Sequence, residues 1–283
     1  MQDPDRSRAA AAAVAAATSL GLPVKDTTVL QDSNKLTLRL LPCDVLARVA
    51  PESDHVAHFE VDVARRLART GAPVALPDPR VGPRVLERDG FVVTLWTYYD
   101  SMTPRQLPSA DYARALGRLH TGMRTLDVPV PHFSDRVERA RRLLADRDRT
   151  PALTGPDRRL LDEVLLGASR LVAERGGAEQ LLHGEPHPGN VLDTEHGPLF
   201  IDFETCCRGP VEFDIAHTPA DVGEHCPEAD PDVLRACRAL VLAMITTWRW
   251  DRDDRFPDGR RLGIRWLRRV RAEHERHGFG LPR

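Results

Sequence analysis

The sequence predicts an α+β fold, with an antiparallel sheet in the N-terminal third and helices through most of the remaining chain. Between residues 28 and 50, short apolar runs alternate with turn-like residues, a pattern typical of consecutive antiparallel strands. From residue 109 onwards, apolar residues recur at helical spacing over long segments. These patterns indicate a sheet-plus-helix lobe at residues 1–96, a short hinge at 97–99 and a helical lobe at 100–283.

The elements of the first lobe follow from local composition. An alanine-rich run with high helix propensity is ended by Gly21-Leu22-Pro23, and a second amphipathic segment is ended by Gly71. Asp89-Gly90 lies between two apolar runs and favours a tight hairpin. We therefore expect helices over 8–20 and 54–70, and about five strands near 27–30, 36–40, 45–49, 84–87 and 90–96.

The second lobe is read as amphipathic helices interrupted by one irregular stretch. Helices are expected over 109–126, 134–148, 156–175, 231–250 and 259–277. In the irregular stretch, Pro186, Pro188 and Gly189 exclude a regular helix or central strand. The apolar run 199–201 is expected to pair back on residues 191–192 as a hairpin and to present Asp202 at its end.

Composition excludes several functional classes. With 40 basic and 42 acidic residues, the chain lacks the basic excess that nucleic-acid binding favours. Its most apolar stretch, 239–247, is too short to span a membrane, and the acidic start carries no secretory pattern, so a cytoplasmic protein is expected. The five cysteines have no C-x-x-C spacing, which indicates reduced thiols and no zinc site.

The irregular stretch carries the residues best suited to chemistry. Glu185 and Asn190 lie in the stiff Pro-rich loop, and Asp202 ends the hairpin strand, so we expect the three to converge on one pocket. A carboxylate, a carboxamide oxygen and a second carboxylate form a hard-oxygen set. Such a set suits Mg²⁺ and a hydroxyl group that must lose a proton.

These motifs resemble those of a known family. HGEPHPGNVL at residues 183–192, followed by IDFE at 201–204, resembles the catalytic and metal-binding loops of the aminoglycoside phosphotransferases, small-molecule relatives of the protein kinases. The resemblance implies a protein-kinase-like two-lobe fold that uses Mg²⁺ with ATP or GTP as co-substrate. It makes Glu185 the catalytic acid that accepts the hydroxyl proton, and makes Asn190 and Asp202 the Mg²⁺ ligands. The family usually has Asp at the position of Glu185.

The resemblance also assigns nucleotide contacts to the first lobe. Arg48 falls where the family has a Lys or Arg that pairs the phosphates, and Glu60 is its candidate partner on the following helix. The backbone of Leu95, Trp96 and Thr97 falls where the adenine docks. The turn at Ser33-Asn34 occupies the position of the phosphate-covering loop but has no glycine.

Supporting and acceptor residues complete the prediction. Asp214, in a D-x-A sequence, is expected to accept backbone N–H bonds from the catalytic loop, and His183 is expected to be a packed structural residue. Two acidic clusters fall where the family places acceptor contacts, and a solvated charged face is the competing interpretation. The first cluster contains Asp221, Glu224, Glu228, Asp230 and Asp232, and the second contains Asp251, Asp253 and Asp254. The candidate acceptor residues among them are Asp221, Glu224, Asp253 and Asp254.

The sequence thus predicts an ATP- or GTP-dependent O-phosphotransferase that modifies a small-molecule hydroxyl. The favoured acceptor is a cationic antibiotic, either an aminoglycoside or a cyclic peptide, whose modification confers resistance. Two alternatives stay open. One is a kinase of a metabolite such as an amino alcohol or sugar, and the other is a nucleotide-binding pseudokinase.

Overall fold

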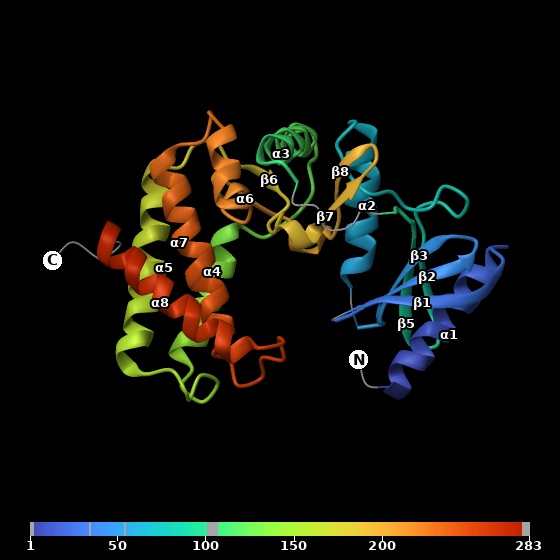
Figure 1. The fold of residues 1–283 in the computed structure, drawn as a ribbon, viewed down its shortest axis with the longest axis horizontal. Helices are drawn as coiled ribbons and strands as arrows, with labels where there is room; N and C mark the ends of the chain where they lie inside the picture. The colour runs from blue at the N-terminus through green and yellow to red at the C-terminus, as the bar shows by residue number, and fades with distance from the viewer. Residues whose placement is uncertain (1–2, 34, 54, 101–106, 279–283) are drawn as a thin grey trace. The chain divides into compact units, whose positions relative to one another are not determined.

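A computed structural model of the chain describes residues 3–33, 35–53, 55–100 and 107–278. The chain divides into two compact units (Figure 1). The first contains Met1–Leu126 and Gly189–Thr205, and the second contains Asp127–Pro188 and Cys206–Arg283. The strands of the first unit are β1 (Val24–Asp32), β2 (Leu36–Pro42), β3 (Val45–Pro51), β4 (Val85–Arg88), β5 (Phe91–Thr97), β7 (Val191–Thr194) and β8 (Gly197–Phe200). Its helices are α1 (Asp3–Ser19), α2 (Val56–Arg69), α3 (Ser109–Met123) and the 3₁₀ turn η2 (Phe203–Thr205).

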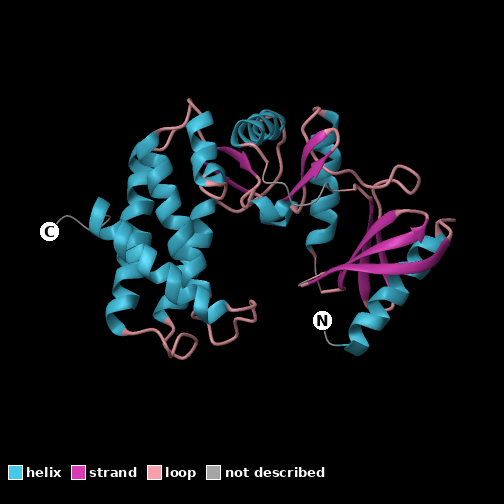
Figure 2. Ribbon diagram, in the orientation of Figure 1, coloured by secondary structure: helices cyan, strands magenta, loops and turns pink. Residues whose placement is uncertain are grey.

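The first unit is built on a five-stranded antiparallel sheet in the order β1-β2-β3-β5-β4 (Figure 2). All five strands expected from the sequence are present, and the α+β fold class is confirmed. β4 and β5 meet at the turn Asp89-Gly90, where both residues have positive φ (56° and 83°). This left-handed pair is the backbone that a two-residue hairpin turn requires, and Asp-Gly favours it.

The two faces of this sheet differ in chemistry because strand side chains alternate between faces. Leu36, Leu38 and Leu40 of β2 lie on one face, where they pack with buried alanines of α1. Arg48 of β3 pairs in register with Thr37 and Thr94 and lies on the other face, together with Glu60 of α2. One face is therefore apolar and the other carries buried charge.

The β7–β8 hairpin belongs to the first unit. Its register pairs Val191 with Phe200 and Leu192 with Leu199, as the sequence predicted. Phe200 forms a parallel bridge with Val74 and donates its N–H to Pro73 O (2.8 Å), and its ring packs edge-on against Tyr112 of α3. These contacts fix the hairpin and the following Asp202 against the segment after α2. The structure groups this hairpin with the first unit, whereas the sequence assigned it to the helical lobe, and that lobe assignment stays a prediction.

The second unit is mostly helical. α4 (Phe133–Ala145), α5 (Gly155–Arg175), α7 (Pro231–Trp248) and α8 (Gly259–His277) share one apolar core, and the bundle is visible in Figure 1. The strands β6 (Gln180–Leu182) and β9 (Cys207–Gly209) pair antiparallel, and α6 (Val211–Ile215) follows β9. The remaining 3₁₀ turns are η1 (Pro188–Asn190), at the junction of the units, and η3 (Ala220–His225).

All five cysteines are buried as free thiols. Within the described ranges, no helix combines the length and the hydropathy needed to span a membrane. The compact first unit does not end at the predicted hinge, since it continues to Leu126 and includes the β7–β8 hairpin. The predicted lobe boundary at residues 96–100 stays a prediction.

Candidate functional site

The charged face of the sheet in the first unit carries a connected cluster of five ionisable side chains. Arg48 donates to Glu60 Oε1, and its second terminal nitrogen lies 3.1 Å from Asp202 Oδ1. Lys35 Nζ lies 3.4 Å from Glu60 Oε2 and 2.5 Å from Glu204 Oε2. Glu60 therefore bridges the two cations. The cluster links β3, α2 and the segment at η2, which are far apart in sequence.

Burial makes these pairings obligatory. Glu60 is only 2% exposed, although it lies on α2 where the sequence pattern placed it beside the apolar stripe. A buried carboxylate without cationic partners would cost several kcal/mol, on the order of 3–5 kcal/mol when one partner of a buried pair is removed. Burial acts to lower the pKa of Arg48, but Glu60 and Asp202 outweigh it and raise that pKa, so the guanidinium stays charged.

The two predicted metal ligands lie close to each other along the hairpin. Ile201 donates its N–H to Asn190 O (3.0 Å), which ties the η1 turn to the residue before Asp202. Asp202 has φ 69°, a left-handed conformation that costs a non-glycine residue on the order of 1–3 kcal/mol and that is typical of functional sites.

The donor chemistry fits Mg²⁺. A carboxylate and a carboxamide oxygen, completed by phosphate and water oxygens, form an ordinary Mg²⁺ environment. Among the residues that the structure describes, no three His, Cys, Asp or Glu side chains gather as a metal site. Asp202 and Asn190 as ligands of Mg²⁺ stay a prediction.

The backbone predicted to receive the adenine is already hydrogen-bonded. Thr97 donates its N–H to Leu76 O (2.9 Å), and Leu95 O accepts from Asp78 N (3.1 Å). Trp96 is buried, and its indole N–H donates to Thr94 Oγ1 (2.9 Å), so its side chain belongs to the core. The adenine contact at residues 95–97 stays a prediction, and it requires backbone groups other than the Thr97 N–H.

In the second unit, the loop after β6 presents Glu185. Asp214 of α6 is fully buried, and its two carboxylate oxygens accept from the N–H groups of His183 (3.0 Å) and Gly184 (2.8 Å). Gly184 has φ 87°, which favours glycine at the turn into Glu185. These bonds fix the backbone on which Glu185 stands.

The Glu185 side chain is held by an arginine that the sequence analysis did not single out. Arg136 of α4 forms an ion pair with Glu185 Oε1 through one terminal nitrogen and donates to Gly184 O (2.9 Å) through the other. The guanidinium also lies over the ring of Trp248, at 5.6 Å from its centroid. This fork can orient the carboxylate, whose side chain is one methylene longer than the usual Asp.

Neighbouring groups are poor alternatives to Glu185 as a base or nucleophile. Burial and the nearby Arg136 lower the pKa of His217 to about 4, and its Nδ1 lies 2.9 Å from Phe213 O. Because a carbonyl only accepts, Nδ1 of the neutral ring is the donor. Burial raises the pKa of the Cys207 thiol, so it stays protonated.

The predicted acceptor residues differ in environment. Asp221 and Glu224 lie exposed on η3. Asp254 is largely buried and lies 3.2 Å from Arg249, while the exposed Asp253 lies 3.8 Å from Arg252. The second cluster is thus internally neutralised, and an acceptor role for any of the four residues stays a prediction.

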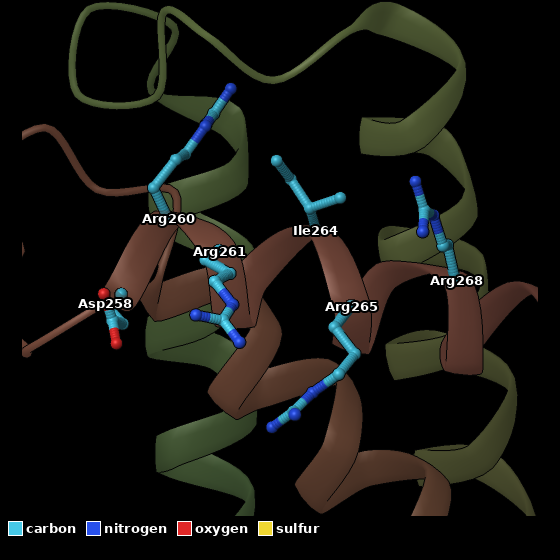
Figure 3. Close-up of a pocket in the computed structure, with 7 residues that line it drawn as sticks. Asp258, Arg260, Arg261, Ile264, Arg265 and Arg268 are labelled. Carbon is cyan, nitrogen blue, oxygen red and sulfur yellow. The ribbon is translucent and has the colours of Figure 1, made fainter.

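A hollow of about 670 Å³ lies on α8 (Figure 3). Its lining includes Arg260, Arg261, Arg265 and Arg268 beside the exposed Ile264. In Figure 3 these guanidinium groups point in different directions and do not converge on one point. The hollow therefore lacks the convergent donors of an anion site.

Sequence reasoning missed three charged residues of these clusters. Glu204 is the last residue of the IDFE motif, and nothing in the sequence gives it a role of its own. Arg136 is one of many arginines in the chain, so its residue type alone does not distinguish it. Lys35 could have been identified from the sequence, since the chain contains only two lysines and Lys35 directly follows the predicted phosphate-covering turn at Ser33-Asn34. Glu185 lies in the second unit, whereas Asn190 and Asp202 lie in the first, so the convergence of these three stays a prediction.

Comparisons with known proteins agree with this picture. The family model of the phosphotransferase enzyme family matches residues 30–273. No curated protein matches the sequence. Among solved structures, the chain is similar to an amicoumacin kinase in complex with AMP-PNP, Ca²⁺ and its ligand Ami (TM-score 0.70, 14% identity, covering 99% of this chain and 98% of that one).

Two further structures show the same fold. One is a choline/ethanolamine kinase family protein from Mesorhizobium loti (TM-score 0.69, 20% identity, covering 98% of this chain and 96% of that one). The other is the GDP and kanamycin complex of APH(2″)-IIIa (TM-score 0.70, 15% identity, covering 88% of this chain and 94% of that one). At these identities the likeness establishes the fold.

Proposed function

Because this chain belongs to the phosphotransferase enzyme family, we propose that it transfers the γ-phosphoryl group of ATP or GTP to a hydroxyl of a small molecule. The observation that carries this proposal is the partly buried bridge from Glu60 through Arg48 to Asp202. It joins the predicted phosphate-pairing residue to the predicted metal ligand within one compact unit. Protein kinases require an equivalent basic–acidic pair and a metal-binding Asp.

Each residue has a defined task in the proposed reaction. Arg48, held by Glu60, binds phosphate oxygens as a planar fork. Glu185, held by Arg136, accepts the proton of the attacking hydroxyl, and Asp214 keeps the backbone of its loop in place. Asn190 and Asp202 would hold Mg²⁺. Mg²⁺, when bound, supplies neutralisation of the charge on the transferring phosphoryl group.

For the acceptor, we favour a cationic antibiotic whose phosphorylation gives resistance. Asp221 and Glu224 support this choice, because exposed carboxylates attract ammonium groups. Two similar structures contain amicoumacin or kanamycin, while a third belongs to the choline/ethanolamine kinase family. A metabolite kinase acting on an amino alcohol therefore remains the second candidate.

The experiment that tests the function combines an acceptor panel with one substitution. Aminoglycosides, cyclic peptides and amino alcohols are assayed for Mg²⁺-dependent phosphorylation, and Mg·ATP binding is measured by calorimetry. Asp202→Asn should abolish transfer and weaken Mg·ATP binding, because a neutral amide cannot match a carboxylate facing a divalent ion. Wild-type turnover in this variant would remove Asp202 as the metal ligand. Nucleotide binding without turnover on any acceptor favours the pseudokinase.

A further inference from the structure

Lys35 occupies a defined position at the end of the loop between β1 and β2. Asp32 pairs in register with Leu36, which leaves a three-residue connection, and Ser33 donates its N–H to Lys35 O (3.2 Å). Leu36 lies on the apolar face against α1, so the preceding Lys35 lies on the opposite face. That is the face that carries Arg48.

The ammonium group of Lys35 is held next to the Arg48 guanidinium by a shared carboxylate. Glu60 accepts from Arg48 with Oε1 and from Lys35 with Oε2, and Lys35 is only 8% exposed. Burial acts to lower the pKa of Lys35, but Glu60 and Glu204 outweigh it and raise that pKa, so the group is an ammonium ion. Two fixed positive charges therefore lie on one sheet face.

The sequence of this loop lacks the glycine that phosphate-covering loops usually carry. Residues 33–35 include no glycine, and the N–H of Ser33 is already donated within the loop. A phosphate-covering loop normally offers several free N–H groups. A cation at the end of this loop supplies the missing attraction by charge.

We propose that Lys35 is a second phosphate-binding cation, which acts beside Arg48 and contacts a terminal phosphate oxygen of the bound nucleotide. The inference rests on the proposed function and deepens it. Glu204 is the partner that phosphate replaces, since its side chain is 30% exposed whereas that of Glu60 is 3% exposed. Glu60 keeps both cations in place during the exchange.

If Lys35 only neutralised Glu60, its substitution would change the binding of ATP and AMP by the same factor. The two roles differ in how binding depends on phosphate number. Calorimetry with Mg·ATP and with AMP on Lys35→Met separates them, and Lys25→Met is the matched control because Lys25 is the only other lysine and lies exposed on β1. Lys35→Arg tests whether charge at this position is sufficient.

We expect Lys35→Met to raise the Kd for Mg·ATP by about 10- to 100-fold, the range of a lost charge-assisted hydrogen bond. The Kd for AMP should be nearly unchanged, Lys35→Arg should lie close to wild type, and Lys25→Met should match wild type. Equal weakening of ATP and AMP binding, or no weakening of either, overturns the inference.

A second measurement uses the wild-type protein and does not depend on how the variants fold. An ATP derivative with an acyl group on the γ-phosphate acylates an adjacent lysine. The lysine ammonium loses its proton to solvent, the amine attacks the acyl carbon to form an amide, and ATP leaves. Mass spectrometry should find the acyl group on Lys35 and not on Lys25, and excess ATP but not adenosine should suppress it. Wild-type protein that binds no nucleotide overturns the proposed function and this inference together. Nucleotide binding with Lys35 unlabelled, and with Lys35→Met unaffected, overturns this inference alone.

Discussion

At the scale of single residues, the proposed base differs from the usual family residue in length, and Arg136 offsets that difference. The extra methylene of Glu185 gives its carboxylate more freedom, and freedom at a base weakens orientation of the hydroxyl. Arg136 removes this freedom by binding both the carboxylate and the carbonyl of Gly184. The longer acid and the partly buried Arg136 thus act as a pair.

Glu185→Gln should lower kcat by about 10²- to 10⁴-fold, the contribution of a working general base, and leave Mg·ATP binding nearly intact. Glu185→Asp keeps the charge but withdraws it from Arg136, so we expect an intermediate kcat. Steady-state kinetics on the acceptor found by the panel, with calorimetry for ATP, measures both effects. The exposed Glu179→Gln is the control. A Gln variant as fast as wild type removes Glu185 from the mechanism.

His217 makes the stability of the second unit dependent on pH. Its pKa is about 4 in the folded chain, lowered by burial and then by Arg136, against about 6.5 in an unfolded chain. The unfolded state therefore binds the proton first as pH falls. The stabilisation is complete above pH 6.5 and is lost between about pH 6.5 and 4.

As the pH falls from about 6.5 to 4, the free energy of unfolding should decrease less for His217→Asn than for wild type. We expect the difference to be on the order of 1–3 kcal/mol. The Asn amide keeps a donor for Phe213 O and does not titrate. Urea denaturation at several pH values measures the difference. His196→Asn, at a largely exposed histidine, should show almost none. Parallel pH profiles for wild type and His217→Asn would contradict the assignment.

At the scale of elements, the sequence predicts long segments with a regular apolar period. It does not predict short strands whose pairing depends on distant parts of the chain. α8 spans Gly259–His277 as predicted, because its apolar spacing and its left-handed Gly278 stop are local signals. β6 and β9 have only three residues each and pair across distant sequence, so no periodicity reveals them. Glu60 of α2 shows the same limit within a site, since its burial depends on two cations from elsewhere in the chain, Lys35 of the β1–β2 loop and Arg48 of β3.

Some carboxylates of the acidic run at residues 221–232 stabilise helix α7 and are not available to bind a ligand. Asp230 is the N-cap of α7 and accepts from the N–H groups of Asp232 (2.8 Å) and Val233 (3.0 Å). Asp232 pairs with Arg175 (2.5 Å) and Arg235. Both residues thus have structural roles in α7, and an acceptor role for Asp221 and Glu224 stays a prediction.

Asp230→Ala should destabilise the chain by about 0.5–2 kcal/mol, the usual value of a lost N-cap. Asp230→Asn should recover most of this loss, because Asn caps helices about as well as Asp. Chemical denaturation measures both variants, and Glu228→Ala, at an exposed neighbour, is the control. Equal stability of the Ala variant and wild type would show that α7 does not depend on this cap.

At the scale of the whole molecule, near-neutral net charge conceals local separation of charge. The formal net charge is −2, yet the exposed face of α8 bears several arginines while η3 bears exposed acids. Separated patches of this kind can attract a charged ligand to one part of a neutral protein. Such attraction weakens as salt screens it, with a Debye length of about 8 Å at 0.15 M.

We therefore expect the apparent KM for the acceptor to rise with ionic strength more steeply than the KM for ATP. Asp221→Asn with Glu224→Gln should raise the acceptor KM and leave the ATP KM nearly unchanged, because these two exposed carboxylates face solvent and lie outside the nucleotide cluster. The pair Asp253→Asn with Asp254→Asn should also raise the acceptor KM, but it removes the partner of Arg249 and should lower stability as well. Glu87→Gln with Glu195→Gln, at exposed acids of the first unit, is the matched control. If the preferred acceptor is neutral or anionic, or if the η3 pair changes neither KM, the cationic-antibiotic proposal fails and the metabolite kinase takes first place.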